Sequence, residues 1–421
     1  MSQPRPSSIL ALGVGSFALG MLRPLSENGA RVATYLTRTY AHHPPSLIGP
    51  TFTRDQVPNP CTLIRERDVE LVIPMSIDWW LAPWSKELIS TGTAIFCPTG
   101  EGMRLERERD FARQLCLDHG ICAAKAFLAQ NRSTAREMLK AEPGPYVIKN
   151  PLCSPTSPIH TILCQTLKDT LAWLDRVDDA EGIFLQEYLG HREAGHLAVV
   201  SAGEIHSLAS NQEYKRAFTG GLGIVAGAPL GGIVEKDPDD KYGLARQLLH
   251  PLLPWFRAVN YHGPVQVTAI LHQNRWKVIE YNIRLGVTSG AMIMRLLENP
   301  VEVLVQTARN LPVRPRFKTD LGFGCSVTLA GYGYPYVQVQ GPSLPVEVLG
   351  EPDCDLYWNE VAPGSNGDLL ATGHRIVDVI GMATTLDQAR AKTYKNVRLL
   401  RSPGSYYRTD VGFCLWPPGC D

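Results

Sequence analysis

Apolar and polar positions along the chain follow two periods, and these periods predict its secondary structure. The segment Ser7–Leu36 reads as a buried strand, a glycine turn, a helix and a second strand at Arg31–Leu36, which is how a parallel α/β sheet begins. Short apolar runs at Val69–Ser76 and Thr93–Thr99 add further buried strands. We expect this first subdomain to end near Gly100.

A helical period follows at Met103–His119. Three apolar residues fall on its inward stripe, namely Leu105, Phe111 and Leu115. The charged run "ERERD", Glu106–Asp110, is predicted to lie on the exposed side. A strand over "GPYVIKN" then delivers Lys149 into the Pro/Ser/Thr loop "PLCSPTSPIHT", a composition typical of turns.

The next strands are expected in "GIFLQEYLG" and "AGHLAVVSAGEIHSLAS". A glycine-rich stretch, "TGGLGIVAGAPLGG", connects them to a long predicted helix at Lys241–Trp255. Another helix is predicted at Ala291–Leu311, and the chain from about Pro312 is rich in strands. The glycines of this stretch and of "GVGS" are more typical of turns than of phosphate-binding loops.

The strand "KVIEYNIRLG" carries the most suggestive chemistry. Because side chains alternate along a strand, Glu280, Asn282 and Arg284 share one face. The apolar residues between them face the core: Ile279, Tyr281 and Ile283. The polar face is either solvated surface or a site. As a site, its carboxylate and amide would suit Mg²⁺ beside a phosphate, and its guanidinium would hold a carboxylate or a phosphate. Lys149, at the end of a strand, either reaches solvent or pairs with an anion.

Composition narrows the class of protein. The 421 residues carry 41 basic and 41 acidic side chains, so neither nucleic acid nor a membrane surface is an expected partner. The ten cysteines include no CxxC pair, which favours reduced thiols in a cytoplasmic protein. The apolar run "ILALGVGSFALGML" is interrupted by glycines and too short to span a bilayer.

The order of these motifs resembles the ATP-grasp superfamily. Five segments are similar, in sequence order, to the glycinamide ribonucleotide synthetase (phosphoribosylamine–glycine ligase) family: "SNQEYKRAFTGGLGIVAGAP", "KVIEYNIRLG", "SVTLAGYGYP", "LATGHRIVDVIGMATTLDQARAKTY" and "YRTDVGF". The resemblance covers essentially the whole chain. It implies an α/β (α+β ATP-grasp) fold with a parallel-sheet domain at 1–102, an ATP-grasp domain at 103–312 and a strand-rich domain at 313–421. The small lobe would span about 103–190 and the large lobe about 191–312.

The resemblance also implies where ATP would bind. Arg109 stands where the family has its first phosphate-facing lysine, and Lys149 stands at the second. The adenine hinge would be formed by "QEYL", that is Gln186, Glu187, Tyr188 and Leu189. Glu193 matches the ribose-binding acid, and Lys215 of "QEYKR" belongs to the same nucleotide site.

The implied reaction forms an amide through an acyl phosphate. Glu280 and Asn282 would hold Mg²⁺ (or Mn²⁺) against the ATP phosphates. Arg284 and Lys149 would be catalytic, with Arg284 stabilising the acyl phosphate and its transition state. The implied partners are a small carboxylate and an amine, and a homodimer is possible. Arg375 and Tyr332 are weak candidates for substrate contact.

Departures from the family fall mainly on the substrate side. The loop "GVGSFALG" lacks the family's arginine, glutamate and histidine, and Val287–Ser289 replaces its Asp-Pro-Glu. The glycine-rich lid is replaced by "NPLCSPTSPIHT", and the loop after "QEYKR" is shortened to "AFT". These changes predict a ligase with altered substrates, such as an amino acid and an amine. Two alternatives remain, an authentic phosphoribosylamine–glycine ligase and a non-catalytic nucleotide-binding regulator.

Overall fold

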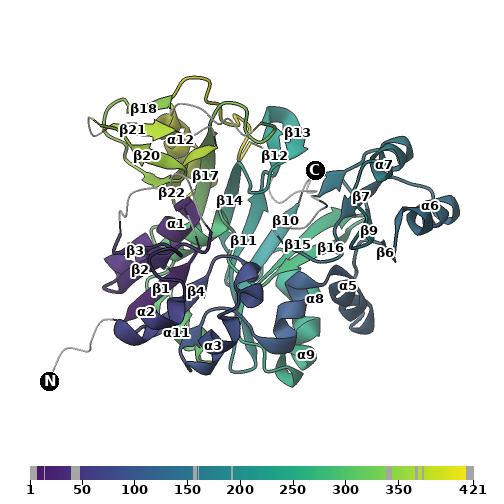
Figure 1. Cartoon of the computed structure of the whole chain (residues 1–421), viewed down its shortest axis with the longest axis horizontal. Coiled ribbons are helices and arrows are strands. Elements are labelled where there is room, and N and C mark those ends of the chain that lie inside the picture. The colour runs from purple at the N-terminus through teal and green to yellow at the C-terminus, as the bar shows by residue number, and fades with distance from the viewer. Residues whose placement is uncertain are drawn as a thin grey trace.

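The computed structural model describes residues 7–13, 15–38, 48–154, 159, 161–190, 193–337, 344–365, 368–371 and 374–413. Strands and helices form a mixed α/β fold, as predicted (Figure 1). No helix in these ranges is both long and apolar enough to cross a membrane. The eight cysteines that the structure describes are all free thiols.

The N-terminal part is a five-stranded parallel sheet in the order β3-β2-β1-β4-β5. Its strands are β1 (Ser8–Leu12), β2 (Arg31–Tyr35), β3 (Thr51–Phe52), β4 (Leu71–Pro74) and β5 (Ala94–Ile95). Its helices are α1 (Gly15–Glu27), α2 (Pro60–Glu66) and α3 (Ser85–Ser90), with a 3₁₀ turn at Ile77–Leu81. The predicted strand–turn–helix–strand opening is therefore confirmed. The buried β1 residues are apolar apart from Ser8 because the sheet is covered on both faces.

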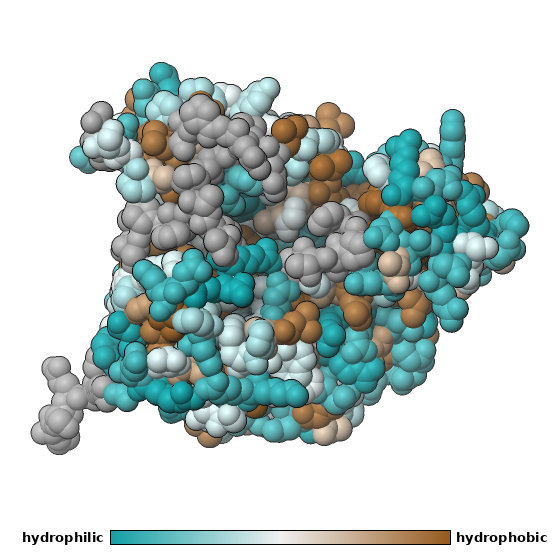
Figure 2. All heavy atoms as spheres, viewed as in Figure 1, coloured by the Kyte–Doolittle hydropathy of each residue, from teal (hydrophilic) through white to brown (hydrophobic). Residues whose placement is uncertain are grey.

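The small lobe stands apart, at the right of Figure 1, with its own sheet and core. Its strand order is β6-β9-β7-β8. The strands are β6 (Ala126–Ala129), β7 (Tyr146–Lys149), β8 (Ile162–Leu163) and β9 (Ile183–Glu187), and the helices are α6 (Arg132–Ala141) and α7 (Leu167–Leu174). Figure 2 shows a hollow between this lobe and the rest of the molecule.

An eight-stranded sheet forms the centre, in the order β16-β15-β10-β11-β14-β17-β22-β19. Its strands are β10 (Ala194–Ser201), β11 (Glu204–Glu213), β14 (Gly231–Lys236), β15 (Gly263–His272), β16 (Arg275–Asn282), β17 (Phe323–Ala330), β19 (Asp355–Trp358) and β22 (Arg375–Ala383). A hairpin, β12 (Arg216–Phe218) and β13 (Leu222–Val225), projects from it around a 3₁₀ turn at Thr219–Gly221. The sheet thus continues from the predicted large lobe into the predicted C-terminal part.

The C-terminal part adds a second small sheet, in the order β20-β21-β18-β23, beside α12 (Leu386–Val397). Its strands are β18 (Leu344–Val348), β20 (Val361–Pro363), β21 (Leu369–Ala371) and β23 (Leu400–Arg401). Helix α12 packs on β17 and β22 of the central sheet, so this part is joined to the centre by strands and by a helix.

Each of the three predicted long helices is broken. The segment Met103–His119 forms a 3₁₀ turn (Gly100–Met103), α4 (Arg104–Arg107) and α5 (Arg109–Asp118). The break is at Glu108, whose backbone is extended and bridges to Leu152. The break turns Glu106 inward to 4% exposure, so the prediction that "ERERD" is exposed is wrong for Glu106.

Proline explains the other two breaks, because it lacks an N–H and fits only the first turn of a helix. The segment Lys241–Trp255 divides into α8 (Leu244–Leu248), a 3₁₀ turn (His250–Leu252) and α9 (Leu253–Ala258), with prolines at the starts of the last two. The segment Ala291–Leu311 divides into α10 (Ser289–Leu296) and α11 (Pro300–Ala308).

Candidate active site

Strand β16 presents its polar face as predicted. Glu280 lies opposite Thr268 of β15, and Asn282 lies opposite Gln266. Both are partly exposed, as is Arg284, while Tyr281 and Ile283 are buried. The alternation fails at Ile279, where the register shifts by one residue and the side chain is partly exposed. The placement of Ile279 in the core is therefore corrected to a β-bulge.

Three cations surround the carboxylate of Glu280. The Nζ atom of Lys215 lies 2.8 Å away, Arg109 Nη1 lies 3.9 Å away and Lys149 Nζ lies 4.0 Å away. Burial alone would raise the pKa of Glu280, but these cations lower it well below its usual value. Glu280 is therefore ionised in any ordinary buffer.

Lys215 lies at the centre of three acids. Its Nζ is 2.6 Å from Glu193, 2.8 Å from Glu280 and 3.8 Å from Glu213. Burial lowers its pKa, but the carboxylates of Glu193, Glu280 and Glu213 raise it well above the usual value. Glu193 thus lies in the same cluster as Glu280, as the family resemblance implied for two parts of one nucleotide site.

Lys149 ends β7 and is 4% exposed. Its Nζ donates a hydrogen bond of 2.8 Å to Gln186 Oε1, and Gln186 Nε2 donates one of 2.9 Å to the carbonyl of Ile279. Gln186 therefore links the small lobe to the bulge in β16. Burial lowers the pKa of Lys149 to about 8, although Glu280 acts in the opposite direction.

Arg109 and the hinge residues surround the same region. Arg109 Nε donates to the carbonyl of Asn150, just beyond Lys149. Glu187 and Tyr188 are held by backbone bonds to Lys125 and Pro145, of 2.7 and 3.1 Å. A pocket is lined by residues of α5, β9 and β16, including Arg109, Cys116, Phe184, Gln186, Ile279 and Glu280.

For the rest of the predicted hinge and lid, the structure gives fewer contacts. Tyr188 and Leu189 are partly exposed at the end of β9. Residues 155–158 and 160 of the predicted lid lie outside the described residues. The nucleotide roles of the hinge therefore stay predictions.

Glu106 is the site residue that the sequence did not reveal. Its Oε1 lies 3.2 Å from Arg284 Nε, and its Oε2 accepts a 2.7 Å hydrogen bond from the backbone N–H of Ile283. Burial lowers the pKa of Arg284, but Glu106 and other nearby acids raise it above its usual value. Glu106 thus fixes both the backbone and the guanidinium at the end of β16.

The two weak candidates, Arg375 and Tyr332, lie away from this cluster. Arg375 is buried and donates to Asp378 Oδ1 at 2.7 Å and to the carbonyl of Pro229 at 2.6 Å. Asp378 also accepts from Ser16 at the start of α1, so Arg375 belongs to a network that joins the two ends of the chain. Tyr332 is 60% exposed.

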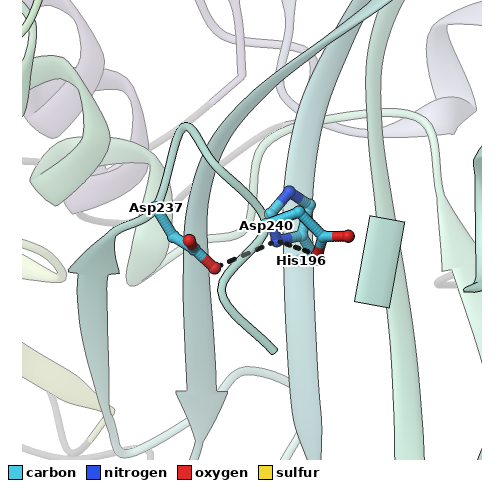
Figure 3. Close-up of side chains that lie close together, drawn as sticks. All are labelled: His196, Asp237 and Asp240. Atoms are coloured by element: carbon cyan, nitrogen blue, oxygen red, sulfur yellow. Dashed lines mark ion pairs between the residues drawn. The ribbon is translucent and has the colours of Figure 1, made fainter. Parts of the chain in front are cut away.

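A second group of potential metal ligands lies on β10 and after β14. His196, Asp237 and Asp240 bring their ligand atoms within 4.8 Å of one another (Figure 3). Their atoms already bond elsewhere: His196 to Ser210 and Ser207, and both aspartates to backbone N–H groups near α8. Burial lowers the pKa of His196. The group is best explained as a structural network.

The strand orders and the charged cluster between the lobes define an ATP-grasp protein, and comparison with known proteins agrees. The domain family "Phosphoribosylglycinamide synthetase, ATP-grasp (A) domain" matches residues 107–289, and "Phosphoribosylglycinamide synthetase, C domain" matches residues 324–414. The chain belongs to the phosphoribosylglycinamide synthetase family of ATP-grasp ligases. The predicted superfamily and family are thereby confirmed.

Individual relatives are distant in sequence but similar in length. The phosphoribosylamine–glycine ligase of Brucella melitensis is 24% identical over 371 residues, which cover 83% of this chain and 84% of the relative. That of Listeria innocua is 26% identical over 341 residues, covering 76% and 79%. The crystal structure of the Thermotoga maritima phosphoribosylamine–glycine ligase matches with a TM-score of 0.70 at 23% identity, covering 96% of this chain and 99% of that one.

The fold is shared more widely. A Campylobacter jejuni biotin carboxylase complex matches with a TM-score of 0.70 at 13% identity, over 96% of this chain and 93% of that chain. At such low identity the likeness extends to the fold alone.

Proposed function

We propose that this protein is an ATP-dependent carboxylate–amine ligase that forms an amide through an acyl phosphate, with substrates that differ from those of its named relatives. The observation that carries the proposal is the cluster around Glu280, where an ionised carboxylate meets Lys149, Lys215 and Arg109 between the two lobes. Concentrated fixed charge of this kind suits phosphoryl transfer, which depends on positioning and charge neutralisation.

ATP would lie between the small lobe and the central sheet. Lys149 and Arg109 would face its phosphates, Glu193 its ribose, and Gln186–Leu189 its adenine. Lys215, already paired with Glu193 and Glu280, would keep Glu193 in place. Burial lowers the pKa of Lys149 to about 8, and a bound phosphate would raise this pKa again, so Lys149 would stay protonated in the complex.

The donor set on β16 fits a hard divalent cation. Glu280 is ionised, and the amide oxygen of Asn282 is on the same face, so two oxygen ligands are available for Mg²⁺ (or Mn²⁺). When bound, such an ion neutralises phosphate charge. Lys215 and the ion would compete for Glu280, so this acid would exchange one cation for another on binding.

The reaction needs no nucleophile from the protein. A carboxylate oxygen of the first substrate attacks the γ-phosphorus of ATP, the bond from that phosphorus to the β-γ bridging oxygen breaks, and ADP leaves. The amine nitrogen then attacks the acyl carbon, the carbon–oxygen bond to phosphate breaks, and the amine loses a proton as phosphate departs. Arg284, held by Glu106, would stabilise the charge on the acyl phosphate.

Altered substrates are proposed because one of the departures lies beside the reacting end of this site. Val287–Ser289 begins three residues after Arg284, and Thr288 and Ser289 are almost fully buried. The second candidate function is that of the relatives, phosphoribosylamine–glycine ligase, and the names of those relatives favour it.

Release of ADP and phosphate from the purified protein with Mg-ATP tests these functions together. Pools of amino acids and amines, and phosphoribosylamine with glycine, are the conditions. We expect turnover in a pool other than the phosphoribosylamine pair. Turnover with that pair, or rescue of a purine-requiring strain that lacks the enzyme, would favour the second candidate. ATP binding without turnover in every condition would indicate a non-catalytic regulator.

A further inference from the structure

An apolar face lies on the hairpin of β12 and β13. Phe218, Leu222 and Ile224 are 38%, 64% and 45% exposed. Phe218 pairs with Leu222 across the hairpin, and Ile224 is two residues beyond Leu222, so the three side chains share one face. Single exposed apolar side chains are common, whereas a group of neighbouring ones indicates a binding surface.

Tyr336 extends this face. Its ring stacks on that of Phe218, with centroids 5.9 Å apart and planes 9° from parallel. Its hydroxyl accepts a 2.9 Å hydrogen bond from the backbone N–H of Ile224, and the residue is exposed. We call Phe218, Leu222, Ile224 and Tyr336 the rim face.

The hairpin that carries the rim face is held by the C-terminal part of the chain. Gly220, at the turn, donates a 2.9 Å backbone hydrogen bond to Asp410, and Arg408 donates one of 2.8 Å to the carbonyl of Arg216. Gly220 has a φ of 74°, which favours glycine. The rim face is therefore formed in advance, and a preformed surface binds a ligand with a smaller loss of conformational entropy.

The rim face is continuous with the candidate active site. Its hairpin begins directly after Lys215, whose Nζ lies 2.8 Å from Glu280, and is closed by a 2.9 Å backbone hydrogen bond from Ala226 to Lys215. On the other side, β13 lies against β8 of the small lobe, which pairs with the strand that ends in Lys149. Figure 2 shows apolar residues gathered at the place of this hairpin, beside the hollow between the lobes. A substrate that enters the hollow there would contact the rim face.

The chemistry of the rim face selects the group that it binds. None of its four side chains is charged, and the guanidinium of the neighbouring Arg216 donates a 3.0 Å hydrogen bond to the carbonyl of Gly223. Two aromatic rings and two aliphatic side chains bind an apolar group by removing it from water, and an aromatic group also by stacking. A phosphate placed on this face would lose hydration without gaining a charged partner.

The order of the reaction indicates which substrate this group belongs to. The acid reacts first, beside Arg284, and the amine then approaches the acyl phosphate from the open side of the hollow. We propose that the rim face binds the side group of the amine substrate, so that this amine carries an aromatic or large aliphatic group and no phosphate. This inference rests on the proposed function, because it assigns the amine of that reaction.

Direct binding tests the proposal without depending on turnover. Isothermal titration of the full chain, with a non-hydrolysable ATP analogue and Mg²⁺ present, would compare four primary amines: 2-phenylethylamine, hexylamine, ethanolamine and O-phosphoethanolamine. We expect 2-phenylethylamine or hexylamine to bind at least tenfold more tightly than the two polar amines. Equal binding of all four, tighter binding of a polar amine, or no binding of any would overturn the proposal.

Two variants place this preference on the hairpin. Leu222→Ser and Ile224→Ser alter exposed side chains, so both proteins should fold, and each should weaken binding of the apolar amine about 5- to 20-fold without affecting ethanolamine. The matched control is Leu81→Ser, which changes another exposed leucine in the N-terminal part. An unchanged ratio of the two affinities in both hairpin variants, with folding intact by circular dichroism, would contradict the assignment.

Two other occupants of the rim face give different results. If the face only closes the small lobe through β8, both variants would weaken binding of the ATP analogue as much as binding of the amine. If the face binds a second copy of this chain, sedimentation velocity would show a dimer that Leu222→Ser dissociates. We expect neither result, and either one would reject the proposal.

The same samples separate this proposal from the proposed function. Binding of the apolar amine that follows the hairpin variants, without ADP release in any condition, would keep the rim face as a binding site and reject the ligase. Amide formation with the same KM for 2-phenylethylamine and ethanolamine would keep the ligase and reject the rim face. Turnover with phosphoribosylamine would also reject it, because that amine carries a phosphate.

Discussion

The cluster around Glu280 and the oxygen triad beside Gly286 (Ser289 Oγ, Glu213 Oε1 and Gln266 Oε1) share Glu213, but they are built differently. In the cluster, each acid or base has an oppositely charged neighbour within 4.0 Å. In the triad, two buried oxygens have no partner among the described residues. The charges of the cluster are therefore balanced within the protein, whereas Ser289 Oγ and Gln266 Oε1 keep hydrogen-bonding capacity that no described residue meets.

The largest effect is expected where the cluster is broken. Glu280→Ala removes the proposed metal ligand and leaves Lys215, Lys149 and Arg109 without their shared acid. We expect ATP turnover to fall at least about 100-fold, because both cation binding and charge balance are lost. ADP release at saturating Mg-ATP measures this.

Glu137→Ala is the matched control, because Glu137 also pairs with a lysine, Lys140, but on the exposed surface of α6. It should leave turnover unchanged. Unaltered turnover in Glu280→Ala would remove this residue from the mechanism and leave the cluster with a structural role.

The next largest effect is expected at Glu106, which holds Arg284 just beyond the end of β16. Glu106→Gln keeps an oxygen for the N–H of Ile283 but removes the charge that holds Arg284. We expect kcat to fall about 10- to 100-fold with little change in KM for ATP, because Arg284 acts on the developing charge. Steady-state kinetics at several ATP concentrations would separate the two constants. A change confined to KM would instead place Glu106 in nucleotide binding.

A smaller effect is expected from filling the triad. In Gly286→Ala the added methyl group would lie 2.4 Å from Ser289 Oγ and 2.9 Å from Glu213 Oε1. We expect KM for the acid to rise about tenfold and the free energy of unfolding to fall by about 1–3 kcal/mol. ATP affinity should not change, and a parallel loss of ATP affinity would show that the two regions are not separable.

The smallest effect is a pH dependence within the cluster. Burial lowers the pKa of Lys149 to about 8, so the free protein loses this proton above pH 8 while bound phosphate would retain it. ATP affinity should therefore fall several-fold between pH 8 and 9.5, with proton uptake on binding. Since unfolded lysine keeps its proton to about pH 10.4, the contribution of Lys149 to the free energy of unfolding rises over the same window.

Calorimetry in two buffers of different ionisation enthalpy measures the proton uptake. Lys149→Met should abolish it. Equal proton uptake in that variant would assign the titration to another group.

The alternation of β16 could be predicted from the sequence because one face of a strand in the sheet is core, and Glu280, Asn282 and Arg284 fall on the other. The motif order also predicted the fold. The bulge at Ile279 could not be predicted, since it depends on pairing with β15 and on the bond from Gln186.

Glu106 was missed for a similar reason. Its neighbours in "ERERD" are charged, and a continuous helix would place Glu106 on the side opposite Leu105, Phe111 and Leu115. The break at Glu108 arises from a bridge to Leu152, far along the chain, so no local pattern could reveal it. The oxygen triad likewise combines residues from three different elements, and the individual residues are ordinary strand and helix-start residues.

The continuity of the central sheet sets a limit on how the chain can be divided. Strand β14 hydrogen-bonds to β17 along its length, across the predicted boundary between the ATP-grasp and C-terminal domains. A fragment ending near residue 312 would leave β14 as an open edge with unpaired N–H and C=O groups, and such an edge recruits other chains. Truncated forms should therefore aggregate, and genetic fusions or domain exchanges in this family would have to be cut elsewhere.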